Sequence, residues 1–242
     1  MLKNFKIPLP PLDIQDQIVK ECQKVDDEVQ KANETIEQTK KEIKNEINST
    51  NDKKIKLSAI AITNPSKREI SNIDENTIVS FVEMASVSNE GFIETKIDRP
   101  LKDLKKGSFT YFAENDIIIA KITPSMENGK CAIAYDLTNS LGMGSSEFHV
   151  IRVKENINSK YLFSYLNQET IRKEAEKQMT GASGHRRVPI SFYENLQIPL
   201  PSLEIQKEIV SRIEKLETII SEAKKIVESA KEKKEEILKK YL

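Results

Sequence analysis

The sequence predicts an α+β protein in which one mixed α/β domain is flanked by two long α-helices that form an antiparallel coiled coil. Three observations predict it: a segment near the N-terminus is repeated near the C-terminus, a long heptad pattern follows each copy, and strand-like runs fill the chain between them. The chain of 242 residues, 38% hydrophobic and 31% charged, is long enough for this division. The predicted regions are residues 1–50 (N-terminal lead-in and long helix), 51–195 (middle domain) and 196–242 (C-terminal lead-in and long helix).

The repeated segment is Ile7–Val19, which returns as Ile198–Val210 with nine of thirteen positions identical. Both copies begin with Ile-Pro-Leu-Pro. Proline lacks an amide donor and biases the residue before it toward extended conformations, so the start of each copy cannot be helical. Each copy is therefore predicted to be a lead-in, meaning an extended segment that runs into a helix. Ser202 is the expected N-cap of the second helix, and Pro11 takes the same place in the first.

A heptad pattern follows each lead-in. Apolar residues recur in alternating steps of four and three, with Glu and Lys on the other faces, as in a coiled coil. At about 1.5 Å per residue each helix would be about 55 Å long. The alternative is two amphipathic helices packed on a globular body. Helices built alike at the two ends of a chain are expected to pack against each other or against a second chain. The expected seam residues are Ile18, Val25, Val29, Ile36 and Ile43 in the first helix and Ile209, Ile213, Leu216, Ile220 and Val227 in the second.

The middle domain contains runs rich in Ile, Val, Phe and Tyr, which predict strands. A helical pattern follows them from Ser159 to Gln178, and Gly181 is placed to end it. About 145 residues are sufficient for a separate hydrophobic core. The expected strands lie in Thr77–Met84, Ser108–Phe112, Asp116–Ile122, Cys131–Tyr135 and Glu147–Val153.

Three loops of the middle domain combine glycine with cationic and hydroxyl side chains. They are the first loop (residues 123–130), the second loop (142–146) and the third loop (180–187). Arg, Lys, Asn, Ser and backbone amides are the groups that hold phosphates and contact base edges. The alternative for the Gly-His-Arg-Arg turn is a solvated loop without a ligand. The candidate nucleic-acid contacts are Lys121, Thr123, Ser125, Asn128, Lys130, Ser145, Ser146, Ser183, His185, Arg186 and Arg187.

The charge totals argue against a simple basic DNA-binding protein. The chain has 38 Lys+Arg and 38 Asp+Glu, and residues 51–195 contain 20 basic and 19 acidic residues. Any nucleic-acid surface must therefore be a local patch. No apolar stretch approaches the length of a membrane span, and the proline-broken N-terminus lacks the apolar core of a signal peptide. We therefore expect a cytoplasmic protein that does not associate with membranes.

No catalytic or metal-binding constellation is found. Cys22 and Cys131 lack the spacing of a zinc site or a disulfide framework, and no glycine-rich nucleotide motif occurs. Glu94-x-Lys96 resembles the end of a nuclease motif, but such a triplet is close to chance in so charged a chain. His149 lies in a strand pattern and is expected to be structural. We expect no enzyme activity, no metal and no cofactor on this chain.

The quoted lead-ins resemble the repeated regions of the specificity (S) subunits of type I restriction–modification systems. Five segments of the middle domain, in order, resemble the target recognition domains of that family. Similar segments occur in the S-like modules of bifunctional restriction–methylation enzymes, so the system type stays open. The five segments are residues 81–91, 116–124, 126–130, 144–149 and 181–189.

The resemblance implies a non-catalytic DNA recognition subunit. Its implied partners are double-stranded DNA, adenine methyltransferase (M) subunits and restriction/motor (R) subunits; S-adenosylmethionine, ATP and Mg are expected only on those partners. The family ordinarily has two recognition domains, whereas this sequence has one, as in a half subunit or a C-terminal piece. A homodimer through antiparallel helices would read a bipartite target with the helix length fixing the spacing. Two other hypotheses remain: a coiled-coil scaffold whose middle domain binds protein, and a nuclease or methyltransferase in its own right.

Overall fold

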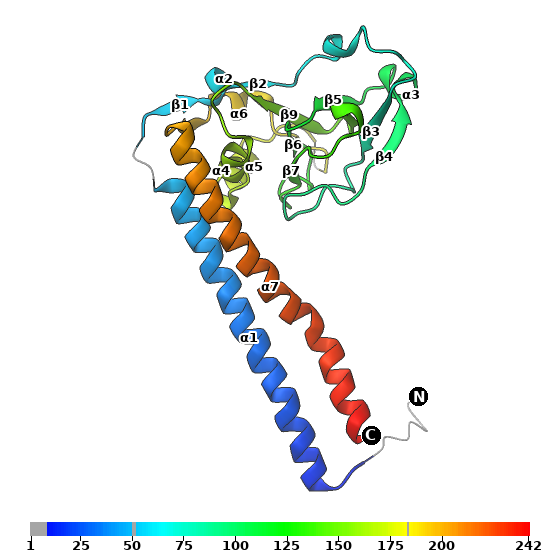
Figure 1. Ribbon diagram of the computed structural model, residues 1–242, viewed down its shortest axis with the longest axis vertical. Helices are drawn as coiled ribbons and strands as arrows, with labels where there is room; N and C mark the ends of the chain where they lie inside the picture. Colours follow the sequence, from blue (N-terminus) through cyan, green and yellow to red (C-terminus); the bar gives the residue numbers. More distant parts are fainter. Residues whose placement is uncertain (1–8, 50–51, 183) are drawn as a thin grey trace. The chain divides into compact units, whose positions relative to one another are not determined.

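The computed structural model describes residues 9–49, 52–182 and 184–242. The chain divides into two compact units (Figure 1). One is formed by the described part of residues 1–46 together with residues 211–242, and the other by residues 47–210. Two long helices dominate the first unit: α1 (Leu12–Asn48) has 37 residues and α7 (Leu203–Tyr241) has 39.

In the helical unit, α1 and α7 pack against each other in antiparallel fashion within one chain. Arg212 pairs with Glu46 near the C-terminal end of α1, whereas Lys240 pairs with Glu21 near its N-terminal end. The predicted α+β fold class with an antiparallel helical pair is confirmed. Among the expected seam residues, Val25, Ile36 and Ile213 are buried in this unit, and Ile209 is buried in the other unit. Half-buried members are Ile18, Val29, Ile43, Leu216, Ile220 and Val227.

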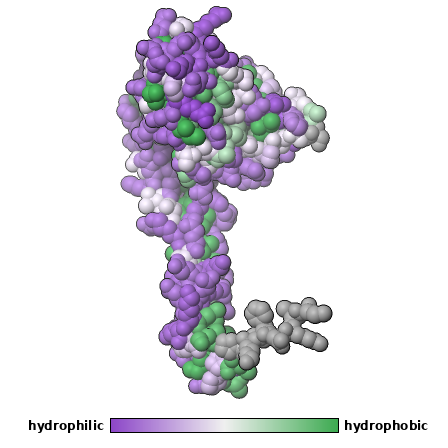
Figure 2. Space-filling view, turned by 90° about the vertical axis from the view of Figure 1, so that its right-hand side faces the viewer, coloured by the Kyte–Doolittle hydropathy of each residue, from purple (hydrophilic) through white to green (hydrophobic). Residues whose placement is uncertain are grey.

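The surface of the helical pair is mostly hydrophilic, which agrees with the alternating Glu and Lys residues of the sequence (Figure 2). A group of exposed apolar residues lies toward the end that carries the start of α1 and the end of α7. Leu12 is 77% exposed and Val19 is 64% exposed. The first lead-in therefore leaves apolar side chains uncovered.

Residues 47–210 form two four-stranded sheets and one strand pair. The order β2-β9-β6-β7 is antiparallel throughout, whereas in the order β4-β3-β8-β5 the pair β3–β8 is parallel. The strand pair joins β1 and β10. The strands are β1 (Lys54–Lys56), β2 (Ala61–Thr63), β3 (Ile78–Val82), β4 (Ile97–Pro100), β5 (Thr110–Ala113), β6 (Ile117–Ala120), β7 (Cys131–Ile133), β8 (Leu141–Gly144), β9 (Phe148–Val153) and β10 (Gln197–Pro199).

Short helices accompany these strands, and the core lies on both faces of β6. Ile117 and Ile119 belong to a cluster with residues of the helices that follow β9, whereas Ile118 packs in a second cluster with Phe112 and Phe148. This is the alternation expected of a strand buried on both faces. The helices are α2 (Leu57–Ile60), α3 (Leu101–Lys105), α4 (Ser159–Leu166), α5 (Glu169–Lys177) and α6 (Ile190–Asn195), with 3₁₀ turns at Lys67–Ile70 and Thr138–Ser140.

Each of the five predicted strand runs coincides with a strand, but the prediction of one helix from Ser159 to Gln178 was wrong. The helix is broken between α4 and α5, because Gln168 has extended backbone angles (φ −64°, ψ 140°). Arg172 stabilises the break by donating hydrogen bonds to the backbone and side-chain oxygens of Asn167.

The expected second loop also differs, because residues 141–144 form strand β8 inside a sheet. Gly142 packs so closely on Phe112 that an added Cβ would lie 2.1 Å from the ring. At Gly144 an added Cβ would lie 2.7 Å from the carbonyl oxygen of Val82. These glycines therefore permit close packing of the sheet, and only Ser145 and Ser146 remain as a turn.

The second lead-in packs into the unit of residues 47–210. Ile198 of β10 is fully buried, and the hydroxyl of Tyr161 donates to the carbonyl of Pro199 at 2.7 Å. The side chain of Gln206 donates to the carbonyl of Pro201 at 2.9 Å and accepts from the backbone amide of Asn158 at 2.8 Å. The start of α7 is thus fixed to α4 by one glutamine.

Candidate nucleic-acid interface

Segments from the three predicted loops lie side by side. The backbone amide of Thr123 donates to the carbonyl of Arg186 at 3.0 Å. The backbone amide of Val188 donates to the carbonyl of Lys121 at 2.9 Å. The amide of Lys121 in turn donates to the carbonyl of Glu147 at 2.9 Å. Residues 121–130, 145–147, 180–182 and 184–188 therefore form one site, which we name the three-loop site.

The third loop is closed by its own backbone and by Glu147. Thr180 and Arg187 exchange two backbone hydrogen bonds of 3.0 and 2.8 Å. The Arg187 guanidinium donates to both Glu147 oxygens, at 2.9 and 2.7 Å, and to the carbonyl of His185 at 3.0 Å. Hydrogen bonding from Arg187 lowers the pKa of the Glu147 carboxyl. Arg187 is thus engaged within the protein, joining the third loop to the turn before β9.

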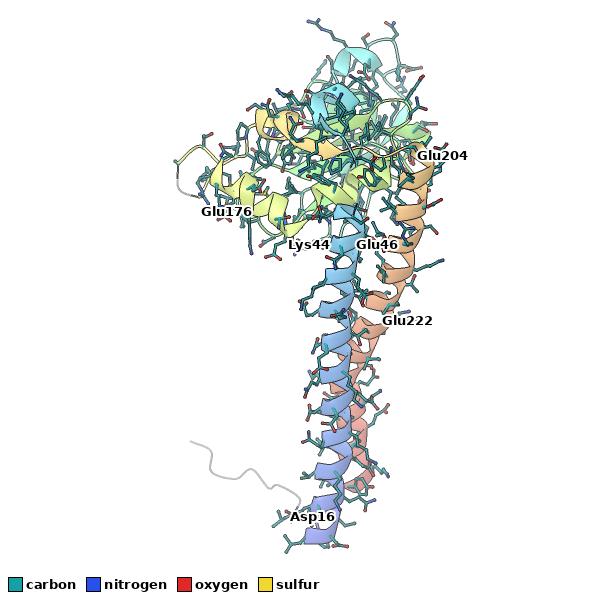
Figure 3. All side chains as sticks on the ribbon, turned by 90° about the vertical axis from the view of Figure 1, so that its left-hand side faces the viewer. Asp16, Lys44, Glu46, Glu176, Glu204 and Glu222 are labelled. Atoms are coloured by element: carbon teal, nitrogen blue, oxygen red, sulfur yellow. The ribbon has the colours of Figure 1, made fainter. Side chains whose placement is uncertain are left out.

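Arg186 differs from its neighbour in how it is held. Its Nη2 lies 3.7 Å from a Glu127 oxygen and 3.9 Å from a Glu176 oxygen, and its side chain is 40% exposed. Glu176 lies at the end of α5 (Figure 3). Both contacts are ion pairs, and both distances are too long for a hydrogen bond. The Arg186 guanidinium therefore donates no hydrogen bond to a described residue, and its N–H groups can donate to a ligand.

The first loop is folded on itself around a buried methionine. Met126 is buried, and its amide bonds to the carbonyl of Ile122 at 3.0 Å. The Thr123 hydroxyl donates to Glu127 Oε1 at 2.5 Å. Glu127 Oε2 is buried and has no hydrogen-bond partner in the described part of the chain. The positive charge of Arg186 is the compensation that the structure places beside this carboxylate.

Lys130 uses its ammonium group inside the domain. It donates to the backbone carbonyls of Met84, Ala85 and Val87 at 3.1, 3.3 and 2.7 Å. This arrangement holds the turn after β3, so Lys130 is not presented to a ligand in the way that Arg186 is. Its assignment as a DNA contact stays a prediction.

The remaining candidates differ in accessibility. Asn128 and His185 are exposed, whereas Lys121, Thr123 and Ser125 are half-buried. Ser145 and Ser146 are half-buried, and the Ser145 hydroxyl accepts from the amide of Glu147 at 3.2 Å. Ser183 lies outside the described residues. The structure thus brings Lys121, Thr123 and the arginines together with the serine turn.

His149 lies beneath the site and is buried. Its Nε2 lies 2.8 Å from the carbonyl of Val188, and its Nδ1 lies 3.4 Å from the Asn64 amide nitrogen. An Nε2–H that donates and an Nδ1 that accepts satisfy both contacts. Burial lowers the pKa of His149, so the neutral ring is favoured. A histidine with both nitrogens satisfied supports the third loop rather than acting as a base.

Sequence reasoning did not single out Glu127 and Glu147. Glu147 is forty positions from Arg187, and nothing in the local sequence joins them. Glu127 lies four positions after Thr123, whose hydroxyl donates to it, so this contact is local in the sequence. In a chain with 38 acidic residues, neither carboxylate is distinctive without coordinates.

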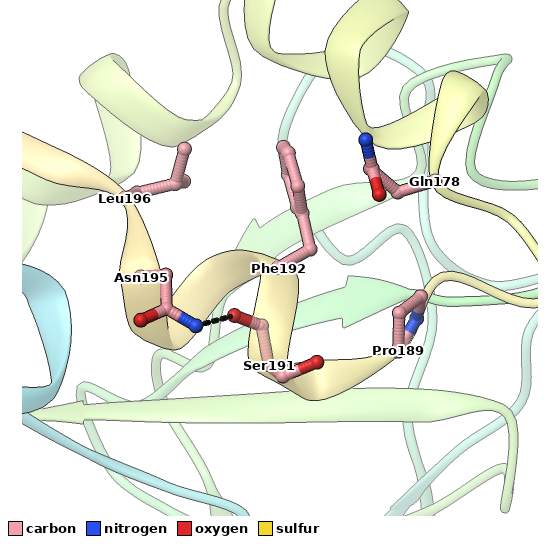
Figure 4. Close-up of a pocket in the computed structure, with 6 residues that line it drawn as sticks. All are labelled: Gln178, Pro189, Ser191, Phe192, Asn195 and Leu196. Carbon is pink, nitrogen blue, oxygen red and sulfur yellow. Dashed lines mark hydrogen bonds between the residues drawn. The ribbon is translucent and has the colours of Figure 1, made fainter.

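Three other kinds of site come into question in the described chain: a metal centre, a membrane span and a pocket beside α6. In residues 9–49, 52–182 and 184–242, no group of three His, Cys, Asp or Glu side chains is arranged to hold a metal ion. None of the helices described combines the length and apolarity needed to cross a membrane. A hollow of about 360 Å³ beside α6 lacks a titratable lining residue (Figure 4), so a phosphate would find no counter-charge there. Its lining residues are Gln178, Pro189, Ser191, Phe192, Asn195 and Leu196.

Solved structures share this fold. The HsdS subunit from Thermoanaerobacter tengcongensis aligns with a TM-score of 0.59 at 18% identity, covering 97% of this chain and 59% of that one. The type I S subunit from M. genitalium aligns with a TM-score of 0.52 at 13% identity, covering 96% and 61%. These TM-scores indicate a common fold.

Characterised relatives are similar in sequence as well. The chain is 43% identical over 163 residues to the type I restriction enzyme EcoAI specificity subunit and 37% identical over 166 residues to the EcoEI specificity subunit, both of Escherichia coli. It spans 27% of the length of each. Its identity to the MjaVIII specificity subunit of Methanocaldococcus jannaschii is 26% over 263 aligned positions, covering 98% of this chain and 61% of the relative.

The family follows from the match to a family model. The model described as "Type I restriction modification DNA specificity domain" matches residues 53–231, which is more than half of the chain. The chain belongs to this family, and the resemblance inferred from the sequence is confirmed. The match covers the middle domain, the second lead-in and most of α7.

Proposed function

We propose that this chain is a sequence-specific DNA recognition subunit of a restriction–modification complex. The observation that carries the proposal is the three-loop site, which lies inside the domain that matches the DNA specificity family. Within that site, the Arg186 guanidinium makes no hydrogen bond to a described residue, and an arginine can contact guanine through two parallel hydrogen bonds. Lys121 and the exposed loop residues would contact phosphates and set the orientation of the domain on the duplex.

Affinity for DNA should depend on partner subunits. Residues 51–195 contain 20 basic and 19 acidic residues, so the middle domain has little general attraction for phosphates. We propose that methyltransferase subunits, and restriction/motor subunits through them, supply the remaining DNA contacts. S-adenosylmethionine, ATP and Mg would be held by those subunits, and this chain would be non-catalytic. Its proposed location is the cytoplasm.

The helices would set the spacing between two half-sites of a bipartite target. In the described chain α1 and α7 pair with each other, and Ile36 packs near Ala223 in their seam. A homodimer through antiparallel helices would form the same seam with α1 of one chain against α7 of its partner, as in a domain swap. Light scattering at tens of micromolar would distinguish this homodimer from a monomer with intramolecular pairing.

The test of the function is selection from DNA of random sequence. The chain, assembled with its methyltransferase partner, is incubated with duplexes whose central segment is randomised, and bound duplexes are sequenced. Enrichment of one split sequence is the expected result. Binding without enrichment would favour the scaffold hypothesis, in which the middle domain binds protein. S-adenosylmethionine binding by the isolated chain would instead favour a methyltransferase.

A further inference from the structure

Two carboxylates within the three-loop site stand beside its arginines, where a DNA-binding surface would be expected to exclude them, and a third, Glu176 of α5, lies 3.9 Å from Arg186. Glu127 lies 3.7 Å from Arg186, and Glu147 lies 2.7 Å from Arg187. A carboxylate near DNA repels phosphates, so both residues lower the affinity for every sequence unless they have another role. We propose that Glu127 and Glu147 are positioning residues, which hold the third loop and Arg186 in the conformation that reads DNA. This inference rests on the proposed function.

Glu147 acts on the backbone of the third loop through Arg187. The bidentate pair uses Nε and Nη2 of Arg187, and its Nη1 donates to the His185 carbonyl, two residues earlier in the same loop. One side chain therefore joins the third loop to the turn before β9 and also fixes the course of the loop. A bidentate arginine–carboxylate pair is specific in geometry as well as favourable in energy. Arg187 therefore has a structural role: it fixes the third loop, from which Arg186 would contact DNA.

Glu127 acts on Arg186 itself. Its Oε1 accepts from Thr123, and its Oε2 is buried without a hydrogen-bond partner among the described residues. The Arg186 guanidinium lies 3.7 Å from Oε1 and so places a positive charge beside this carboxylate. A guanidinium has five N–H donors in a planar fork, so one edge can face a carboxylate while another faces a base. Glu127 would thus restrict the side chain to orientations in which the outer edge is free.

The two roles of a carboxylate predict opposite results for Glu127→Gln. The variant keeps an oxygen for the Thr123 hydroxyl and loses the negative charge. If Glu127 only repels DNA, the variant binds every duplex more tightly, with an unchanged ratio of target to non-target affinity. If Glu127 positions Arg186, that ratio falls by at least about fivefold, the lower end of what one bidentate base contact contributes.

A charge exchange tests Glu147. In the assembled complex, Arg187→Glu and Glu147→Arg each place two like charges together and should lower the affinity ratio. The double variant restores an opposite pair and should recover most of it. If the double variant is as defective as Arg187→Glu alone, the opposite charges at positions 147 and 187 are not what holds the third loop, and the proposed role of Glu147 is wrong.

The experiment measures binding of the assembled complex to two duplexes, one with the sequence selected from the random library and one with that sequence scrambled. Glu155→Gln, at an exposed residue in the turn after β9, is the matched control and should leave the ratio unchanged. Circular dichroism melting of each variant checks folding. A wild-type complex without sequence preference would contradict the proposed function. A wild-type preference that Glu127→Gln leaves intact would contradict this inference alone.

Discussion

The two lead-ins have nearly the same sequence but very different surroundings. In both, a glutamine side chain donates to the carbonyl of the proline five positions earlier: Gln15 to Pro10 at 2.8 Å and Gln206 to Pro201 at 2.9 Å. Yet Val19 is 64% exposed, and its counterpart Val210 is 8% exposed. The local conformation is therefore encoded in the repeat itself, and the burial is not.

The difference in burial comes from the contacts of the glutamine oxygen and of the apolar side chains in each copy. Gln206 accepts the backbone amide of Asn158, the residue that caps α4, and is 1% exposed. β10 of the second lead-in pairs with β1. Among the residues described for the first lead-in, Leu12 and Val19 lie open to solvent. The glutamine–proline hydrogen bond thus stabilises the conformation of each copy of the repeat. The glutamine oxygen and the extended backbone can in addition bind a domain, as they do in the second copy.

Matched substitutions in the two lead-ins test this comparison. The largest difference in stability is expected between Ile18 and its counterpart Ile209. Ile209 is completely buried, so Ile209→Ala should lower the free energy of unfolding by about 2–5 kcal/mol. Ile18 is half-buried, and Ile18→Ala should cost about 1 kcal/mol or less. Urea unfolding followed by circular dichroism measures both. Equal losses would show that the two copies are buried alike in solution.

The glutamine pair should give an intermediate difference. Gln206→Ala leaves the amide of the half-buried Asn158 without its acceptor, which should cost about 1–3 kcal/mol. Gln15→Ala removes only the hydrogen bond to Pro10 and should cost about 0.5–1 kcal/mol. Hydrogen exchange at Asn158 provides a local readout, and its protection should fall in the first variant alone. Unchanged protection in Gln206→Ala would mean that the connector does not hold α4.

The smallest difference is expected where a hydroxyl replaces a methyl group. Val210→Thr places a hydroxyl in a nearly buried position and should cost about 1–2 kcal/mol. Val19→Thr changes an exposed residue and should leave stability within about 0.5 kcal/mol. Thermal unfolding of the two variants compares them directly. A large loss in Val19→Thr would reveal a partner surface over the first lead-in.

The features that the sequence predicts well are those with a local cause. Prolines forbid helix in the lead-ins, the heptads specify α1 and α7, and β-branched runs specify five of the strands. The break at Gln168 was missed because apolar spacing continues across it, although the backbone does not. Strand β8 was missed because Gly142 and Gly144 resemble loop residues, and only Phe112 explains them.

The candidate site shows the same limit. Loop composition identified Arg186 and Arg187 but could not distinguish them, because the distinction depends on carboxylates from other segments. Lys130 was chosen for its charge, and its three carbonyl partners lie more than forty positions earlier in the chain. Residue type indicates what a side chain can bind, whereas the fold decides which of its donors remain free.

The most direct measurement is to exchange the middle domain and map DNA methylation. Residues 52–195 are replaced by the matching segment of a relative with a different target, and each full chain is expressed with its methyltransferase partner. Methylated adenines are then mapped across the host genome. We predict that every half-site read by the exchanged domain, which in the homodimer is both of them, changes to that of the donor while the spacing is retained. An unchanged target would contradict DNA recognition by this domain.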